Sequence, residues 1–244
     1  MSVTNSTSGT SVHEIAAGIY RISTPIPPSQ MPGGFTFNQF LVVDQEPLLF
    51  HTGPRGMFPL VKEAVAHVLG DVAKLRYIGF SHVESDECGA LNQFLAVAPR
   101  AETLCSTVAA MVQMNDLADR PPRPLADGEE VSLGSKSVRW LDAPHLPHNW
   151  ECGYLFEGTT RTLLCGDVFT HGGADGPPVT ESEVLSPAEG FRKAMGGVAL
   201  EAHTRSLIEK LAATEPVTLA IMHGSSYRGN GQALLRGLAD ALGA

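Results

Sequence analysis

The sequence concentrates one histidine and three carboxylates within six positions, 82–87, which read His-Val-Glu-Ser-Asp-Glu. His82, Glu84 and Asp86 are two residues apart, so in an extended loop their side chains point to the same side. Neighbouring carboxylates repel one another, and a multivalent cation removes that repulsion. The pattern therefore predicts a metal site. The alternative is a solvated acidic loop in which Asp86 caps the helix that follows.

Three more residues that commonly bind metals follow strand-like runs elsewhere in the chain. His148 comes after one such run, Asp167 follows the apolar residues 163–165, and His223 follows residues 219–222. A single histidine or aspartate after a strand is more often a cap or a turn residue than a ligand. Four such places in one chain, counting the loop at 82–87, favour a metal site.

The elements on either side of the loop at 82–87 must hold these side chains in place. Residues 75–80 predict a strand that leads into the loop, and residues 88–96 predict a helix that follows it. A strand on one side and a helix on the other keep a ligand-bearing loop rigid. The rest of the first half predicts a hairpin (12–22), two further strands (35–43 and 47–50), two helices (57–69 and 107–117), a short strand (103–105) and a proline-rich connection (120–124).

A second half begins near Gly128 and again places strands before helices. Its predicted strands are 131–133, 137–141, 153–157, 162–165 and 217–222, with a loop over 172–187 and helices over 187–195, 199–213 and 230–242. Two such halves indicate an α+β fold in which two sheets pack face to face with helices outside. We expect one domain over 12–244. Residues 1–11 predict a disordered leader, because they lack the basic and apolar regions of a signal peptide.

Composition excludes several classes of protein. The 244 residues carry 26 acidic and 17 basic side chains, a net charge of −9, which argues against nucleic acid or an anionic membrane surface as a partner. No apolar run reaches 18 residues, so no membrane-spanning helix is predicted. The four cysteines form no CxxC pair, which excludes a zinc ribbon or a thioredoxin-type site. We therefore expect a cytoplasmic protein with reduced thiols.

The order His82-x-Glu84-x-Asp86, His148, Asp167, His223 resembles the metallo-β-lactamase fold and, more closely, the diiron domain of flavodiiron proteins. The zinc branch of that fold has a second histidine where this chain has Glu84, and glutamate is the flavodiiron choice. The 19-residue step from His148 to Asp167 also fits the flavodiiron pattern. The resemblance covers residues 12–242 and implies an αββα sandwich of two mixed sheets.

The resemblance also implies a ligand set. The first metal would take His82, Glu84, His148 and Asp167. The second would take Asp86, Asp167 as a bridge, and His223, with Glu87 as a further candidate because it stands where the family has histidine. Oxygen donors combined with imidazole suit iron or manganese, whereas thiolate-rich sites select zinc. We therefore expect two iron ions, with zinc or manganese as alternatives, and no bound flavin.

Three further residues are candidates for contacts around the metals. His145 precedes His148 by three residues, His171 follows Asp167 by four, and Tyr227 follows His223 by four. His145 and His171 are candidates to line the pocket or to orient ligands through hydrogen bonds. Tyr227 is a candidate hydrogen-bond or proton donor. The alternative for all three is an ordinary role in packing, in the loop or at the surface.

The resemblance implies a non-haem diiron protein that binds and reduces dioxygen or nitric oxide. The sequence contains no flavodoxin-like segment, no cysteine pair for a rubredoxin and no GxGxxG motif after a strand, so we expect an external flavoprotein or other electron donor as partner. A homodimer is a further expectation. Two alternatives stay open. One is a dinuclear hydrolase in which metal-bound hydroxide attacks an ester or thioester, and the other is a non-enzymatic oxygen sensor.

Overall fold

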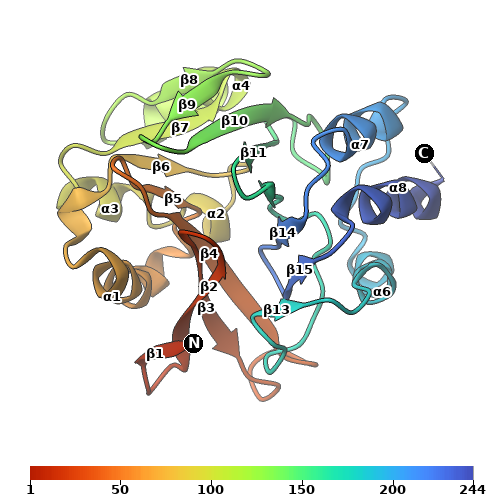
Figure 1. The fold of residues 1–244 in the computed structure, drawn as a ribbon, viewed down its shortest axis with the longest axis horizontal. Coiled ribbons are helices and arrows are strands. Elements are labelled where there is room, and N and C mark those ends of the chain that lie inside the picture. Colours follow the sequence, from red (N-terminus) through yellow and green to blue (C-terminus); the bar gives the residue numbers. More distant parts are fainter. Residues whose placement is uncertain (244) are drawn as a thin grey trace.

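The computed structural model describes residues 1–243 and contains two β-sheets that pack face to face (Figure 1). The first sheet has eight strands in chain order, β1 (Ser2–Asn5), β2 (Thr10–Ala16), β3 (Ile19–Ile26), β4 (Phe35–Val42), β5 (Leu48–Phe50), β6 (Tyr77–Gly79), β7 (Glu102–Ser106) and β8 (Arg123–Leu125). Strands β1 to β5 are antiparallel, and β5 to β8 are parallel.

The second sheet has seven strands in the order β13-β15-β14-β12-β11-β10-β9. Their bounds are β9 (Glu130–Ser132), β10 (Ser137–Asp142), β11 (Gly153–Glu157), β12 (Thr162–Leu164), β13 (Val179–Thr180), β14 (Thr218–Ala220) and β15 (Ser226–Arg228). The pairs β12–β14 and β13–β15 are parallel and the others antiparallel, so both sheets are mixed.

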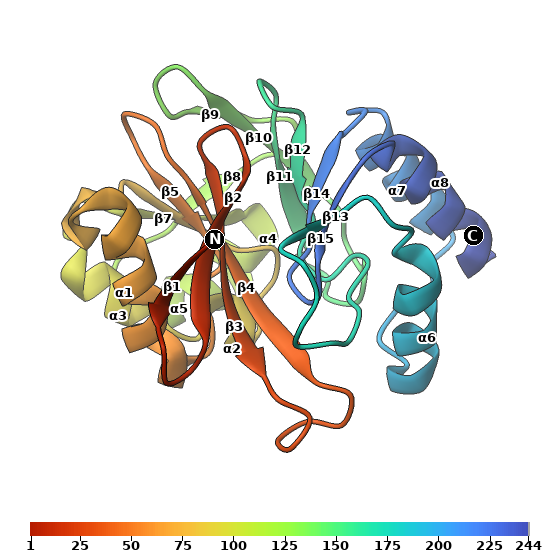
Figure 2. The ribbon, with the colours of Figure 1, turned by 60° about the horizontal axis from the view of Figure 1, so that its bottom comes forward.

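Helices cover the outer face of each sheet (Figure 2). Their bounds are α1 (Phe58–Leu69), α2 (Ser85–Cys88), α3 (Leu91–Val97), α4 (Thr107–Ala109), α5 (Asn115–Leu117), α6 (Leu185–Met195), α7 (Thr204–Ala212) and α8 (Gly231–Leu242), with short turns η1 (Arg55–Met57) and η2 (Val72–Lys74) and a π-helical turn η3 (Ala110–Met114). None of the helices within residues 1–243 is both long and apolar enough to cross a membrane.

Three hydrophobic clusters hold the four layers together. One lies between the sheets and joins Phe40 and Phe50 of the first sheet to Trp140 and Leu155 of the second. The other two pack each sheet against its own helices, α1 and α3 on one side and α6, α7 and α8 on the other. Strand β11 is buried along its whole length, as expected for a strand that is covered on both faces. The predicted sandwich of two mixed sheets with outer helices is confirmed.

Some of the sequence expectations are corrected by strand pairing. We expected residues 1–11 to be disordered, but Ser2–Asn5 form β1 and pair with β2. We expected a connection over 120–124, but Arg123–Leu125 form the edge strand β8, where a proline is tolerated because one side of the strand has no neighbour. Strand β15 was not expected, because Ser-Tyr-Arg shows no apolar alternation. It forms because β13 and β14 pair with it.

The boundaries of other elements also differ from the expectation. The loop expected over 172–187 contains β13 and the start of α6. The helix expected over 88–96 is two helices, α2 and α3, and α2 begins inside the acidic loop. Glu84 occupies the position before α2, so Asp86 and Glu87 lie in its first turn. A helical turn thus replaces the fully extended loop that the alternation of His82, Glu84 and Asp86 suggested.

Candidate metal centre

Three ligand candidates stand at equivalent places after three strands. His82 is the third residue after β6, Asp167 the third after β12, and His223 the third after β14. Strands β12 and β14 are parallel neighbours in which Leu164 pairs with Ala220, so Asp167 and His223 leave the same edge of the second sheet. His148 lies in the loop between β10 and β11. The structure brings these residues together with Glu84, Asp86 and Glu87.

One group of ligand atoms gathers around Glu84. The Nε2 atom of His148 lies 2.9 Å from Oε1 of Glu84, and Nε2 of His82 lies 3.7 Å from the same oxygen. The two Nε2 atoms are 3.2 Å apart. All three ligand atoms fall within 4.8 Å of one another, which is compact enough for a single ion to touch each of them.

Asp167 connects this group to a second one. Its Oδ2 atom lies 3.9 Å from Nε2 of His82, and its Oδ1 atom lies 3.2 Å from Nε2 of His223. His223 Nε2 is also 3.2 Å from Oδ2 of Asp86. The two oxygens of one carboxylate thus face different histidines. This arrangement suits a bridge between two ions.

Glu87 lies between the two groups and is fully buried. Neither of its carboxylate oxygens has a hydrogen-bond partner among residues 1–243, and Oε1 is 3.9 Å from Nε2 of His82. Burial raises the pKa of Glu87 well above its usual value, and the charges of Asp167 and Asp86 raise it further. A buried, unpaired carboxylate is strongly unfavourable unless it binds a cation. The donor set therefore fits a metal better than it fits any internal pairing.

The three histidines each present the same nitrogen to the cluster. Nδ1–H of His148 donates to the Gly197 carbonyl at 3.0 Å, and Nδ1–H of His223 donates to the Thr36 carbonyl at 2.8 Å. A carbonyl only accepts hydrogen bonds, so each Nδ1 carries a proton, and Nε2 is the nitrogen through which a metal would bind in place of a second proton. Nδ1 of His82 is held in the same way by a hydroxyl, Ser81 Oγ, at 2.9 Å.

His51 extends this last contact into a chain of hydrogen bonds. Its Nε2 atom accepts from the backbone N–H of Ser81 at 3.3 Å and lies 3.0 Å from Ser81 Oγ. Burial lowers the pKa of His51 to about 3, so the ring is neutral at physiological pH. Ser81 Oγ therefore donates to His51 and accepts from His82 Nδ1–H. Sequence reasoning missed this role, since residues 51–53 indicated only a turn.

The charges of the cluster shift the pKa values of its members in a consistent way. The contact with Glu84 raises the pKa of His148 to about 9, and the contacts with His148 and His82 lower that of Glu84 to about 2. Burial alone would lower the pKa of His223, but Asp167 and Asp86 raise it to about 9. The carboxylates thus stabilise positive charge on His148 and His223, as expected for a cation-binding centre.

Two aromatic rings surround His223. The ring of Phe35 stacks on the imidazole with centroids 4.3 Å apart, and that of Phe37 meets it edge-on at 5.4 Å. Both come from β4 of the first sheet, across from the strand end that carries His223. The two rings cover His223, a candidate metal ligand, with apolar surface. The sequence offered no signal for them beyond the strand assignment of residues 35–43.

The three other candidates have different surroundings. Both nitrogens of His171 are used near the site: Nδ1–H donates to the Phe169 carbonyl at 2.8 Å and Nε2 accepts from Ser225 N–H at 2.9 Å. His171 therefore supports the segment that follows His223. His145 forms a turn with positive φ, 63°, in the His148 loop. Tyr227 pairs with Leu219, four positions before His223, and its side chain packs against the hydrophobic cluster between the second sheet and its helices.

The fold and the metal-ligand cluster define a metallo-β-lactamase-like protein, and comparison with known proteins specifies the family. The family model described as ODP family beta lactamase matches residues 35–224, and the chain belongs to this family. Among solved structures, rubredoxin oxygen:oxidoreductase from Desulfovibrio gigas superposes with a TM-score of 0.80 at 18% identity over 94% of this chain and 61% of that one. The flavodiiron protein from Giardia intestinalis gives 0.75 at 16% identity, covering 94% and 58%. The predicted likeness to the flavodiiron core is confirmed.

Curated relatives match part of the chain. A nitric oxide reductase from Moorella thermoacetica is 29% identical over 140 residues, which are 56% of this chain and 34% of that protein. A rubredoxin-oxygen oxidoreductase from Megalodesulfovibrio gigas is 27% identical over 142 residues, 57% of this chain and 34% of that protein. The matched regions span about a third of the length of these two relatives.

Proposed function

We propose that this protein holds two iron ions in the cluster and reduces dioxygen or nitric oxide with electrons from an external donor. The observation that carries the proposal is Glu87, a fully buried carboxylate that has no hydrogen-bond partner among residues 1–243 and is set among three histidines and three further carboxylates. The names of the two relatives, a nitric oxide reductase and a rubredoxin-oxygen oxidoreductase, support the substrates and the external donor.

We assign the ligands to two ions by their grouping, in which Asp86, Glu87 and His223 offer atoms within 4.8 Å of one another. The first ion would be held by His82, Glu84, His148 and Asp167. The second would be held by Asp86, Glu87, Asp167 and His223. Four carboxylates offset the charge of two divalent ions, and oxygen-rich donor sets with imidazole suit iron or manganese. Glu84 and Glu87, in place of two histidines, shift the balance away from zinc.

The residues of the chain have defined parts in this function. Bound iron supplies the one-electron redox chemistry that dioxygen or nitric oxide reduction needs. The Nδ1 contacts to Gly197, Thr36 and Ser81 keep the three imidazoles oriented, which limits reorganisation when the charge of the site changes. Phe35 shields the side of His223 and keeps water from that face.

The ligand assignment is tested by metal content. Protein loaded anaerobically with Fe(II) should hold two iron ions per chain by elemental analysis. Glu87→Gln removes one donor charge at constant size and should leave the second ion at least ten-fold more weakly bound. Glu181→Gln, an exposed acid outside the cluster, should retain both. A chain that takes up zinc but no iron, or a Glu87→Gln variant with unchanged iron affinity, contradicts the assignment.

Turnover is tested with electrodes for oxygen and nitric oxide. Iron-loaded protein supplied with NADH and an added flavoprotein reductase should consume dioxygen or nitric oxide continuously. The same mixture with His82→Ala should fall to the background of the reductase alone. Loaded protein that stays inactive with every donor, while cleaving a thioester or phosphodiester, would instead identify the dinuclear hydrolase. Inactivity toward both substrates and esters would favour the oxygen sensor.

A further inference from the structure

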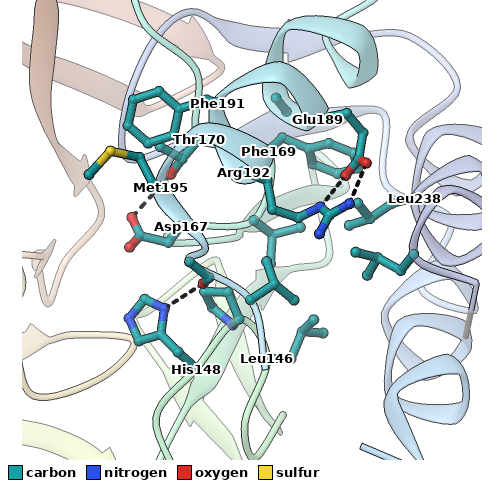
Figure 3. A pocket seen from close by; sticks show the side chains of 16 residues that line it. Leu146, His148, Asp167, Phe169, Thr170, Glu189, Phe191, Arg192, Met195 and Leu238 are labelled. Carbon is teal, nitrogen blue, oxygen red and sulfur yellow. Dashed lines mark hydrogen bonds and ion pairs between the residues drawn. The ribbon is translucent and has the colours of Figure 1, made fainter. Parts of the chain in front are cut away.

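A cavity of about 240 Å³ opens beside the metal-ligand cluster, between the loop of His148, the segment after β12, and helices α6 and α8. Asp167 and His148 form part of its wall (Figure 3). Helix α6 contributes Phe191 and Met195, and α8 contributes Leu238. We call this space the α6–α8 chamber. Of the cluster residues, His148 and Asp167 also line this space.

The wall of the α6–α8 chamber is mainly apolar, and its polar side chains are engaged with other groups. Arg192 makes two hydrogen bonds to the carboxylate of Glu189, at 2.7 and 2.8 Å. Thr170 Oγ1 donates to Asp167 Oδ1 at 3.3 Å, and His148 Nδ1–H donates to the Gly197 carbonyl. Figure 3 shows the Glu189–Arg192 pair beside Leu238, and Asp167 and His148 at the opposite end. An occupant thus meets apolar surface and no unpaired cation.

The volume of the α6–α8 chamber indicates the size of its occupant. An apolar protein cavity of about 150 Å³ stays dry and binds benzene or xenon. A diatomic gas is comparable to one water molecule, whose share of liquid volume is about 30 Å³. At about 240 Å³ the chamber is much larger than dioxygen or nitric oxide needs and matches a ring with a short substituent. It is too small for a peptide segment.

We propose that the α6–α8 chamber binds a small, uncharged, apolar organic molecule of about the size of a substituted benzene. This site goes beyond the proposed function, because neither gas reduction nor electron delivery uses such a ligand. The fit rests on the apolar wall, the paired polar groups and the volume. Anionic analogues are excluded because Arg192 is already neutralised by Glu189 and because a carboxylate would lie near the carboxylate of Asp167.

The occupant has a direct route of influence on the metal cluster. Phe191, in the chamber wall, stacks on Phe35 with centroids 5.7 Å apart and an interplanar angle of 19°. Phe35 in turn stacks on His223 at 4.3 Å. A molecule that packs against Phe191 therefore contacts one end of an aromatic stack whose other end is His223, a candidate metal ligand. Its binding should be visible in the spectrum of the iron-loaded protein as well as in a direct binding measurement.

Binding of toluene to the full chain tests the proposal, both metal-free and iron-loaded, by ligand-observed NMR and calorimetry. We expect saturable, one-to-one binding in both states, at least ten-fold weaker binding of benzoate, and a toluene-dependent change in the iron spectrum. Ala188→Phe fills the chamber from α6, and Ala194→Phe makes the same change on the exposed side of that helix. Toluene affinity should fall at least ten-fold in the first variant and stay within two-fold of wild type in the second.

A rim variant keeps the test independent of folding. Met195 is 64% exposed, so Met195→Trp narrows the opening without disturbing the core. It should weaken toluene binding several-fold at unchanged unfolding temperature. Absence of saturable toluene binding to wild type, equal binding to Ala188→Phe and Ala194→Phe, or uptake of xenon alone would overturn the proposal. Because the metal-free arm does not depend on iron, its outcome is separate from that of the proposed function.

Discussion

At the scale of single residues, the candidate ligands are oriented by groups outside the cluster. Ser81 and His51 fix the proton of His82 on Nδ1, as carbonyls do for His148 and His223. His51 reaches Ser81 across 30 positions of sequence and adopts a φ of 67°, which is unusual for a residue other than glycine. A strained, buried and neutral histidine at this place is explained by its two hydrogen bonds from Ser81.

Replacing His51 tests this positioning role. In His51→Ala the Ser81 hydroxyl loses its acceptor, so His82 is no longer restricted to one tautomer, and the affinity for the first metal should fall about 10–100-fold. His51→Asn keeps an acceptor near Ser81 and should recover part of the loss. Chelator competition with Fe(II) measures both, and His67→Ala on α1 is the matched histidine control. If His51→Ala and wild type bind iron equally, the chain of hydrogen bonds does not position His82.

The residue types of the ligands were predictable, but their supports were not. Spacing and strand ends pointed to His82, Asp167 and His223 because a ligand type recurring at strand ends is a local pattern. The contacts of His51 and Phe35 depend on tertiary packing, which no local pattern encodes. Tyr227 illustrates the converse: its distance from His223 in sequence is short, but the strand turns back and carries it away.

At the scale of elements, the parallel pair β12–β14 decides where Asp167 and His223 lie, and the β11–β12 turn sets the start of β12. The carboxylate of Glu157 organises that turn. It accepts hydrogen bonds from the backbone N–H groups of Thr159 and Thr160, at 2.9 and 2.8 Å, and from the Thr160 hydroxyl. Glu157 is fully buried, so these bonds replace its hydration.

Glu157→Gln should destabilise the metal-free protein by about 1–2 kcal/mol at pH 7, because an amide supports the turn with one uncharged oxygen. Burial opposes the charge of Glu157, but the bonds from Thr160 and Thr159 outweigh it and lower its pKa. Its contribution is therefore present above the unfolded value of 4.5 and is lost as pH falls through the folded pKa. Urea unfolding at several pH values should show the free energies of unfolding of wild type and Glu157→Gln becoming equal in acid. Glu130→Gln, an exposed acid on β9, should show no such difference.

Elements with a clear period were found from the sequence, and elements that depend on pairing were not. Helix α1 buries Val61, Ala64, Val65 and Leu69, and the apolar period over residues 57–69 predicted a helix there, with Val61 and Val65 on its buried face. Strand β15 has no such pattern. Its residues become a strand because the free edge of β14 offers hydrogen-bonding groups to them, which a sequence window does not contain.

At the scale of the whole molecule, the cluster joins the two sheets. His82, Glu84, Asp86 and Glu87 come from the connection after β6 of the first sheet. His148, Asp167 and His223 come from loops of the second sheet. Asn38 of β4 adds an internal tie, donating to the carbonyls of Ile221 and Gly224 at 3.0 and 2.9 Å. Metals bound at the cluster would therefore connect the two sheets at a second place, in addition to the hydrophobic core between them.

Metal removal should reverse the effect of one substitution on global stability. Burial and the charges of Asp167 and Asp86 raise the pKa of Glu87, so the metal-free protein loses stability as pH rises above the unfolded value of 4.5. Glu87→Gln removes that ionisation and should make the metal-free protein about 1–3 kcal/mol more stable than wild type at pH 7, with the difference vanishing toward pH 4. With iron bound, Glu87 is a ligand and binding stabilises the native state by mass action, so wild type should be the more stable of the two. Anaerobic urea unfolding with and without Fe(II), with Glu181→Gln as control, measures the crossover. A Glu87→Gln variant that is less stable than wild type in both states would show that Glu87 is satisfied without a metal.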